Sequence, residues 1–368
     1  MIRQKVGLLF MVSFGFCQLL TAQTDTTSTQ AEEEDYSMYD NLDFVDEGVK
    51  RYAPAKIKGI SPAKLITIGY DSQGKYDMTA SEFTTNAGTY AEQTATVNST
   101  QGLRLEANIP VISNNSLIVQ VGARLWDINY DFEDYKSLTN PLLTNLQNNN
   151  LTSVGLNSTI YKPLNEKSFL LFQLAADVNG DYDFNEFQNM RYTKYSFAAI
   201  WGKRPSDNKQ WGIGLSRTYR AGEMNYIPVV LYNWTSTSNT WGTEILFPAR
   251  AHMRYTVNTR SMFFLGYELE GNSYRIGNQG QSLADQDFDE LEIRRSELRF
   301  RLMYERQIKG FIWMSAQAGY RYNYSYNVDQ LNDGDEFFRG FFGDQEFVQE
   351  NDLTNPLYVS FSINLVSP

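Results

Sequence analysis

The stretch LYVSFSINL, residues 357–365, alternates apolar and polar side chains without a break. Side chains of a β-strand point to opposite faces in turn, so one face here is wholly apolar and the other carries Tyr358, Ser360, Ser362 and Asn364. The pattern predicts a strand that separates an apolar medium from a polar one. Soluble strands usually have about five or six residues, whereas a tilted strand that crosses a bilayer needs about ten. Length therefore favours a membrane.

The same alternation recurs along the chain, and it is sharpest in LRFRL at residues 298–302. Arg299 and Arg301 point to the same side of such a strand, because they are two residues apart. Two neighbouring guanidiniums require a wet space, while the leucines and the phenylalanine between them face the apolar medium. The wet space is either bulk water or the interior of a barrel.

About fourteen such stretches follow one another, and an even number returns both chain ends to one side of a membrane. Short polar turns alternate with mostly longer, acidic connections, as in bacterial outer-membrane barrels. We therefore predict an all-β fold, a transmembrane antiparallel up-and-down β-barrel. Twelve strands is the alternative, because Pro248 interrupts two short stretches. The predicted strands are 64–72, 96–110, 117–130, 151–162, 169–180, 191–203, 210–220, 226–234, 240–247, 250–257, 261–274, 292–306, 311–325 and 356–366.

Aromatic residues bracket the short polar turns of this pattern. Indole and phenol rings favour the headgroup layer of a membrane, because one edge is apolar and the other can hydrogen-bond. The alternative is a soluble antiparallel β protein with aromatic hairpin ends. We predict membrane-interface positions for Trp201, Trp211, Trp234, Trp241, Trp313, Tyr161, Phe169, Tyr304 and Phe311.

The amino-terminal residues fit export. Arg3 and Lys5 precede an apolar stretch at residues 6–20 and small residues before a cut, which predicts a secretory signal peptide over residues 1–23. Its apolar core is too short for a membrane helix. Cys17, the single cysteine, lies inside this signal, so the mature chain is expected to lack disulfides and thiol chemistry.

Composition and charge divide the remaining chain. Residues 24–60 form a polar, acidic leader that we expect to be disordered in the periplasm, and residues 61–368 form the barrel. The net charge of -11 argues against nucleic acid as a partner. The mean hydropathy of -0.44 fits a barrel, because interior and loop residues dilute the apolar outer face.

Charged residues gather on the inward faces of the predicted strands. Arginines opposite carboxylates can create a transverse field that sorts solutes by charge. The alternative is that the charges pair and fill an interior with no open path. The predicted pore-lining residues are Arg104, Glu106, Arg124, Glu244, His252, Arg254, Glu268, Arg295, Glu297, Arg299, Arg301 and Arg321.

One acidic run suggests a calcium loop. Asp177, Asn179, Asp181 and Asp183 place oxygen ligands at alternate positions, as calcium loops do. Tyr182 stands where such a loop needs its glycine, so a solvated acidic loop is the alternative interpretation.

Catalysis is not expected. His252 is the single histidine, and its strand phase turns it inward, away from the lipid face that an outer-membrane lipase would need. We predict that the chain is not an enzyme and has no cofactor.

Several strand pieces resemble an uncharacterised outer-membrane β-barrel family of Bacteroidota. They are residues 227–230 (IPVV), 241–250 (WGTEILFPAR), 265–274 (LGYELEGNSY) and the closing residues 357–368. The resemblance covers most of the chain after residue 60. It implies an outer-membrane location and does not indicate a substrate.

These observations lead to one expected function and one alternative. We expect a passive pore or uptake channel for small polar or anionic solutes in the bacterial outer membrane. The alternative is a non-conducting adhesion or assembly barrel that binds partners through its long external loops. Outer-membrane lipid, lipopolysaccharide and the barrel-assembly machinery are the expected partners, and the sequence indicates no oligomeric state.

Overall fold

The computed structural model describes residues 52–85, 88–182, 193–219, 225–276, 291–330 and 347–367. The predicted signal peptide and most of the predicted leader, residues 1–51, lie outside this part of the chain. Everything described below belongs to the unit Lys50–Pro368. Among the described residues, no helix is long and apolar enough to cross a membrane.

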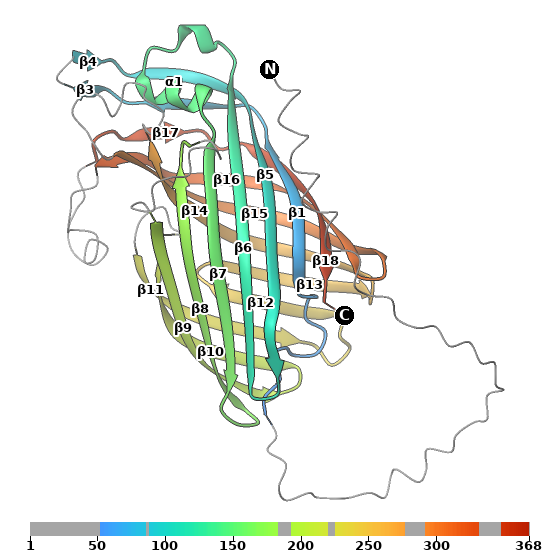
Figure 1. The fold of residues 1–368 in the computed structure, drawn as a ribbon. Coiled ribbons are helices and arrows are strands. Elements are labelled where there is room, and N and C mark those ends of the chain that lie inside the picture. Colours follow the sequence, from blue (N-terminus) through green and yellow to red (C-terminus); the bar gives the residue numbers. More distant parts are fainter. Residues whose placement is uncertain are drawn as a thin grey trace, which may run out of the picture. The chain divides into compact units, whose positions relative to one another are not determined.

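Fourteen antiparallel strands close into a barrel, which confirms the predicted fold class (Figure 1). The barrel closes because β1 pairs with β5 on one side and with β18 on the other. Pro248 lies in the connection between two short strands, so the barrel has fourteen strands rather than twelve. The strands are β1 (Lys64–Gln73), β5 (Gln93–Asn114), β6 (Leu117–Phe132), β7 (Leu151–Pro163), β8 (Ser168–Gly180), β9 (Thr193–Ser206), β10 (Lys209–Thr218), β11 (Asn225–Thr235), β12 (Trp241–Phe247), β13 (Arg250–Asn258), β14 (Ser261–Ile276), β15 (Leu291–Lys309), β16 (Ile312–Gln330) and β18 (Leu357–Val366).

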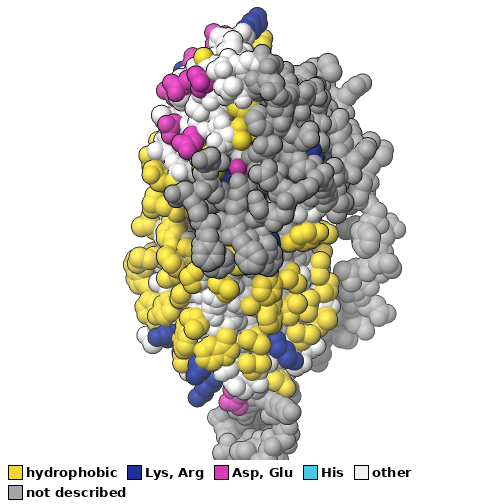
Figure 2. Space-filling view, turned by 90° about the vertical axis from the view of Figure 1, so that its left-hand side faces the viewer, with side chains coloured by type: hydrophobic (Ala, Val, Ile, Leu, Met, Phe, Trp, Pro, Cys, Tyr) yellow, Lys and Arg dark blue, Asp and Glu magenta, His cyan; other side chains and the backbone are white. Residues whose placement is uncertain are grey.

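The alternation of the sequence matches the exposure of the side chains. In β18, Leu357 is 72% exposed and Phe361 is 48% exposed, whereas Tyr358 and Asn364 are buried. Exposed apolar side chains form a band across the face shown in Figure 2, with basic side chains mostly below the band and acidic ones mostly above it. Such a band is what a membrane barrel presents to lipid.

The two ends of the barrel differ. One end, which we call the turn end, carries the short turns after β5, β7, β9, β11, β13 and β15, the start of β1 and the end of β18. The opposite end, the loop end, carries longer connections and additional elements. These elements are β2 (Tyr76–Ala80), β3 (Phe83–Thr85), β4 (Gly88–Tyr90), a 3-10 turn (Tyr135–Ser137), α1 (Pro141–Asn148) and β17 (Asn351–Leu353).

An apolar core fills the loop end. Helix α1 starts there because the Asn140 side chain accepts a hydrogen bond from the Leu142 amide and Pro141 fits the first helical turn. Tyr326 on β16 donates a hydrogen bond to the Tyr130 hydroxyl on β6 at 3.1 Å, so the two walls meet. The loop-end core consists of Tyr76, Met78, Ala80, Phe83, Val97, Trp126, Ile128, Tyr130, Phe132, Leu142, Leu143, Leu146, Leu151, Tyr274, Ile276, Leu291, Ile293, Tyr326 and Val328.

The barrel wall is shorter along the strand direction on the side of β12 and β13 than on the side of β5. β12 has 7 residues and β13 has 9, whereas β5 has 22. At the loop end, β8 and β14 meet in parallel at Gly180 and Arg275, and the Asp181 amide donates to the Arg275 carbonyl at 3.0 Å. At this level of the loop end, β8 therefore pairs directly with β14, although five strands, β9 to β13, lie between them elsewhere in the sheet.

Candidate functional site: the charged interior and its turn-end mouth

Glu297 on β15 lies at the centre of a buried group of charges. Its carboxylate lies 2.5 Å from the Arg299 guanidinium, 3.0 Å from Arg295 and 3.6 Å from Arg321. All four side chains are buried. Three guanidiniums on one carboxylate leave excess positive charge, which other carboxylates must offset because uncompensated buried charge is costly.

Two carboxylates from other parts of the wall provide this charge. Arg299 Nη1 lies 2.8 Å from Glu270 on β14 and 3.5 Å from Asp71 on β1. Arg104 on β5 pairs with Asp71 and, at 2.6 Å, with Glu270. Four strands separate β5 from β14 in the sheet, so this last pair spans part of the interior. The charge network is defined as Asp71, Arg104, Glu270, Arg295, Glu297, Arg299 and Arg321.

An indole ring joins this network to the loop-end core. The centroid of Trp126 on β6 lies 3.9 Å from the guanidinium carbon of Arg104, 5.0 Å from that of Arg295 and 5.6 Å from that of Arg299. Cations are attracted to the face of an aromatic ring. Side chains therefore fill the interior between β6 and β15 at this level.

A second group of charges lies on β12 to β15. Arg254 is fully buried, 2.5 Å from Glu244, and donates to the Thr235 hydroxyl at 2.8 Å. His252 is also buried, with its Nε2 3.2 Å from Nη2 of Arg301. The inward direction predicted for His252 is thus confirmed.

The predicted pore arginines are all paired. Arg301 pairs with Glu268, and Arg124 on β6 donates to Asp177 on β8 at 2.7 Å. With the pairs above, each of the seven arginines has a carboxylate partner. The structure brings most of the predicted residues together in clusters, but as neutralised pairs rather than as a free cationic ladder. Asp71, Glu270 and Trp126 were missed, although the inward phase of both carboxylates could be read from the alternation of their strands.

Space remains beside these pairs. Glu106 on β5 and Gln173 on β8 alternate with outward apolar residues, so they face the interior, and both are nevertheless exposed. β9 and β10 present small inward residues there, among them Ala198, Gly214 and Ser216. Water therefore reaches Glu106 and Gln173, and we call the interior surface formed by these five residues the chamber.

A segment that begins in the predicted leader and ends in the predicted barrel lies at the turn end. Residues 52–63, the mouth strap, contact successive turns of the barrel. The Ala53 amide donates to the Asn165 carbonyl in the β7–β8 turn at 2.9 Å, and the Lys58 amide donates to the Asp207 carbonyl in the β9–β10 turn at 2.8 Å. Residues 52–60 thus have a defined place on the barrel, where disorder was predicted.

After the β9–β10 turn, the strap contacts β12 and then joins β1. Ser61 donates from its amide and its hydroxyl to Glu244 on β12, at 3.0 and 2.7 Å. Three residues later, Lys64 begins β1 and forms an ion pair with Glu305 at 2.6 Å. β1 and β12 are separated by five strands in one direction around the barrel and by seven in the other. The strap therefore crosses the mouth.

Electrostatic and steric contacts fix the strap. Lys58 Nζ lies 3.0 Å from the Asp207 carboxylate, and Arg204 lies 3.2 Å from it. The hydrogen bond from Lys58, with the charges of Lys58 and Arg204, holds the pKa of Asp207 below its ordinary value. Gly59 has a φ of 69°, and a Cβ there would lie 2.9 Å from Thr235 Cγ2. Glycine is thus required at this contact.

The interface aromatics divide into two groups. Trp201, Trp234, Trp241 and Phe311 are exposed, and Trp211 and Tyr304 are partly exposed, as lipid-facing rings should be. The prediction is wrong for Trp313, Tyr161 and Phe169, which are buried inside the turn end. Their strand phase points inward: Leu170 and Phe172, for example, share the outer face that Phe169 does not. Alternation is therefore a better guide than proximity to a turn.

The predicted calcium ligands have protein partners. Asp177 pairs with Arg124, Asn179 accepts from the Ser153 hydroxyl at 2.6 Å, and Asp181 accepts from the Asn145 amide at 3.0 Å. Asp177 and Asn179 lie on β8 rather than in a loop, and Asp183 lies outside the described residues. In the described part of the chain, no group of three or more His, Cys, Asp or Glu residues could hold a metal ion. Calcium binding stays a prediction.

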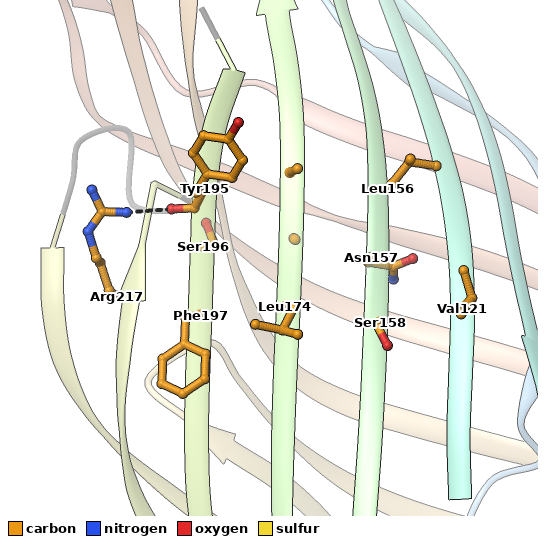
Figure 3. A pocket seen from close by; sticks show the side chains of 11 residues that line it. Val121, Leu156, Asn157, Ser158, Leu174, Tyr195, Ser196, Phe197 and Arg217 are labelled. Carbon is orange, nitrogen blue, oxygen red and sulfur yellow. Dashed lines mark hydrogen bonds between the residues drawn. The ribbon is translucent and has the colours of Figure 1, made fainter. Parts of the chain in front are cut away.

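A hollow on the outer face lies over β6 to β10 (Figure 3). Leu156, Leu174, Tyr195 and Phe197 line it, and Arg217 at its edge donates to the Tyr195 carbonyl at 2.7 Å. Leu156 is 64% exposed, and its neighbours on the strand face the interior. The hollow therefore belongs to the apolar band and not to the chamber.

Fold and interior define a closed antiparallel β-barrel with an apolar outer band and a charged, partly water-accessible interior. Residues 69–364 match the model of a family described as "Domain of unknown function (DUF6268)", and the chain belongs to this family. The expected uncharacterised family is thereby confirmed, while its bacterial phylum stays a prediction. No curated protein matches the chain.

Solved structures with distant likeness include three bacterial proteins. An outer-membrane channel from Pseudomonas putida F1 has a TM-score of 0.34 and 11% identity, over 84% of this chain and 98% of that chain. The Pseudomonas putida toluene transporter TodX has a TM-score of 0.33 and 8% identity, over 86% and 95%. A Pseudomonas aeruginosa FadL homologue has a TM-score of 0.37 and 8% identity, over 82% and 90%. Likeness this distant does not bear on solute or mechanism.

Proposed function

We propose that this protein is a passive uptake channel of the bacterial outer membrane for small polar solutes, anions included. Its location is supported by the apolar band, by the exposed tryptophans at the turn end and by the strand lengths. In this orientation the turn end faces the periplasm. Lipid, lipopolysaccharide and the barrel-assembly machinery are the partners that the proposal implies.

The chamber carries the proposal. Glu106 and Gln173 are inward-facing and exposed, and the side chains beside Gln173, including Ala198 and Ser216, are small. A barrel whose interior served only as a packed core would cover such polar groups with other side chains. A water-accessible, polar interior is what a solute path requires.

The charge network supports the proposal that the solutes are polar and that anions are among them. It contains four guanidiniums and three carboxylates, so its formal charge is +1. Most of the arginine charge is neutralised within the protein. The field that a passing solute meets is therefore weaker than a free arginine ladder would produce.

The test compares two neighbouring alanines on β9 in planar bilayers. Ala198 faces the chamber and Ala199 faces the outer surface. Ala198→Trp should narrow the path and reduce single-channel conductance about twofold or more, whereas Ala199→Trp places the same ring in lipid and should leave conductance unchanged. No conductance by the wild type, or an equal effect of both substitutions, would contradict the proposal.

The loop-end core favours a second candidate. Nineteen buried apolar residues close the described part of that end, as expected for a barrel that binds partners through its loops without conducting. Binding to a surface glycan or protein that depends on the loops, together with no solute entry into swelling-assay liposomes, would support this candidate over the channel.

A further inference from the structure

We propose that the mouth strap, residues 52–63, is the periplasmic gate of the barrel: it closes the turn end in this structure and opens it by leaving its contacts while the strands stay paired. This inference rests on the proposed channel function and adds its regulation. The first support is the course of the strap, which contacts the β7–β8 turn, the β9–β10 turn and β12 before it crosses to β1.

The second support is what the strap covers. Its Ala53 and Ile57 are only 2% and 3% exposed. The Tyr161 hydroxyl donates to the carbonyls of Ala53 and Pro54, at 3.2 and 3.1 Å. Ala55 packs on an inward apolar cluster formed by Tyr161, Phe169, Ile200, Val229 and Leu231. The strap thus seals this half of the mouth.

The other half of the mouth is closed by the wall itself. An inward cluster of Met262, Phe264, Met303, Trp313 and Val366 fills the side of β14, β15, β16 and β18. These residues belong to strands, so moving them would disturb the barrel. The strap is the closing element that can move at low cost.

The third support is the kind of contact that holds the strap. It forms no strand and adds no ladder to the sheet. Its Lys58–Asp207 ion pair is 66% and 62% exposed, and exposed pairs hold weakly. Its tightest point is Gly59, which tolerates no side chain against Thr235. The contacts are sufficient to seat the strap and few enough to be released.

A reversible crosslink tests the gate. The Lys58 amide lies 2.8 Å from the Asp207 carbonyl, so cysteines at these positions are close enough to bridge. Lys58→Cys with Asp207→Cys should conduct poorly when oxidised and recover when reduced, whereas each single cysteine variant should respond to neither treatment. Equal conductance of the oxidised and reduced double variant would overturn the gate and leave the channel standing.

A second measurement does not need conduction. Gln173→Cys reports access to the chamber by its labelling with a bulky, charged thiol reagent in reconstituted vesicles. Adding Gly59→Ala should raise the labelling rate about fivefold or more, because a left-handed φ and the contact with Thr235 both oppose the new methyl group.

Gly310→Ala is the matched control for Gly59→Ala. Gly310 has a φ of 53° in the β15–β16 turn, but nothing lies within 4 Å of its Cβ position. Gly310→Ala should therefore leave the labelling rate of Gln173→Cys unchanged. Equal rates in all three backgrounds would overturn the gate. A rise with Gly59→Ala but no conductance by any variant would retain the strap as a seal and reject the channel.

Discussion

Glu297→Gln is the substitution that tests the charged interior most directly. It keeps the size of the side chain and one carbonyl acceptor, but it removes the negative charge shared by three arginines. Arg299 retains Glu270 and Asp71, and Arg321 retains its hydrogen bond to Gln73. Among the described residues, Arg295 has no second carboxylate within ion-pair distance, so its guanidinium bears most of the loss.

The expected loss of stability follows from the burial of Glu297 and Arg295. Glu297 is 0% exposed and Arg295 is 2% exposed, so bulk water cannot replace the missing charge. Removing one partner of a buried ion pair costs about 3–5 kcal/mol. The remaining contacts of the other two arginines place the expected decrease in the free energy of unfolding near the lower end, at about 3 kcal/mol.

Urea unfolding of the barrel in lipid vesicles, followed by tryptophan fluorescence, measures this decrease. Glu106→Gln is the matched control, because Glu106 faces the same interior but is exposed, and its change should stay within about 0.5 kcal/mol. If Glu297→Gln lowers the free energy of unfolding no more than Glu106→Gln does, the reasoning is refuted. Water would then solvate the charge network, and burial would not determine its contribution to stability.

Two further predictions concern the outer face and the strap. Leu215→Arg puts a charge on the lipid side of β10, where Leu215 is 52% exposed, and should cost about 2–4 kcal/mol and lower the folded yield on heat-modifiable gels. Ser216→Arg points into the chamber and should spare the yield; equal losses would contradict the assigned faces. The lowered pKa of Asp207 means that its attraction to Lys58 and Arg204 is complete above about pH 4 and is lost as the pH falls through that pKa. Single-channel conductance should therefore rise on acidification, and Asp207→Asn should remove that rise; a rise that persists in the Asn variant would exclude this carboxyl as its cause.

Strand alternation made most of the barrel predictable. Residues 357–365 lie within β18 with the expected faces, and Pro248 falls between two strands as the fourteen-strand interpretation requires. Inward phase also identified the charged residues of β15, since Arg299 and Arg301 both point inside. These features are local, because each residue's face follows from its neighbours two positions away.

Partnerships across the interior were not predictable. The pair of Arg104 with Glu270 joins residues far apart in the chain, and nothing in either strand indicates which residue lies opposite. The strap was not predicted for a related reason: residues 52–63 have no periodic pattern, and their place depends on carbonyls in two separate turns and on the Glu244 side chain. The prediction for Trp313 was wrong because proximity to a turn does not determine which face of a strand a residue occupies, whereas its phase in the strand does.

The junction of β1 and β18 gives the charge network a further consequence. Asp71 and Arg104 come from the first third of the polypeptide, whereas Glu270 and the arginine partners of Glu297 come from the last third. The ion pairs that Asp71 and Glu270 make with Arg104 and Arg299 are therefore completed only when β1 joins β18. A sheet that stays open would leave Arg104 without Glu270, and an uncompensated buried charge is costly, so the charge network favours the closed barrel over an open sheet.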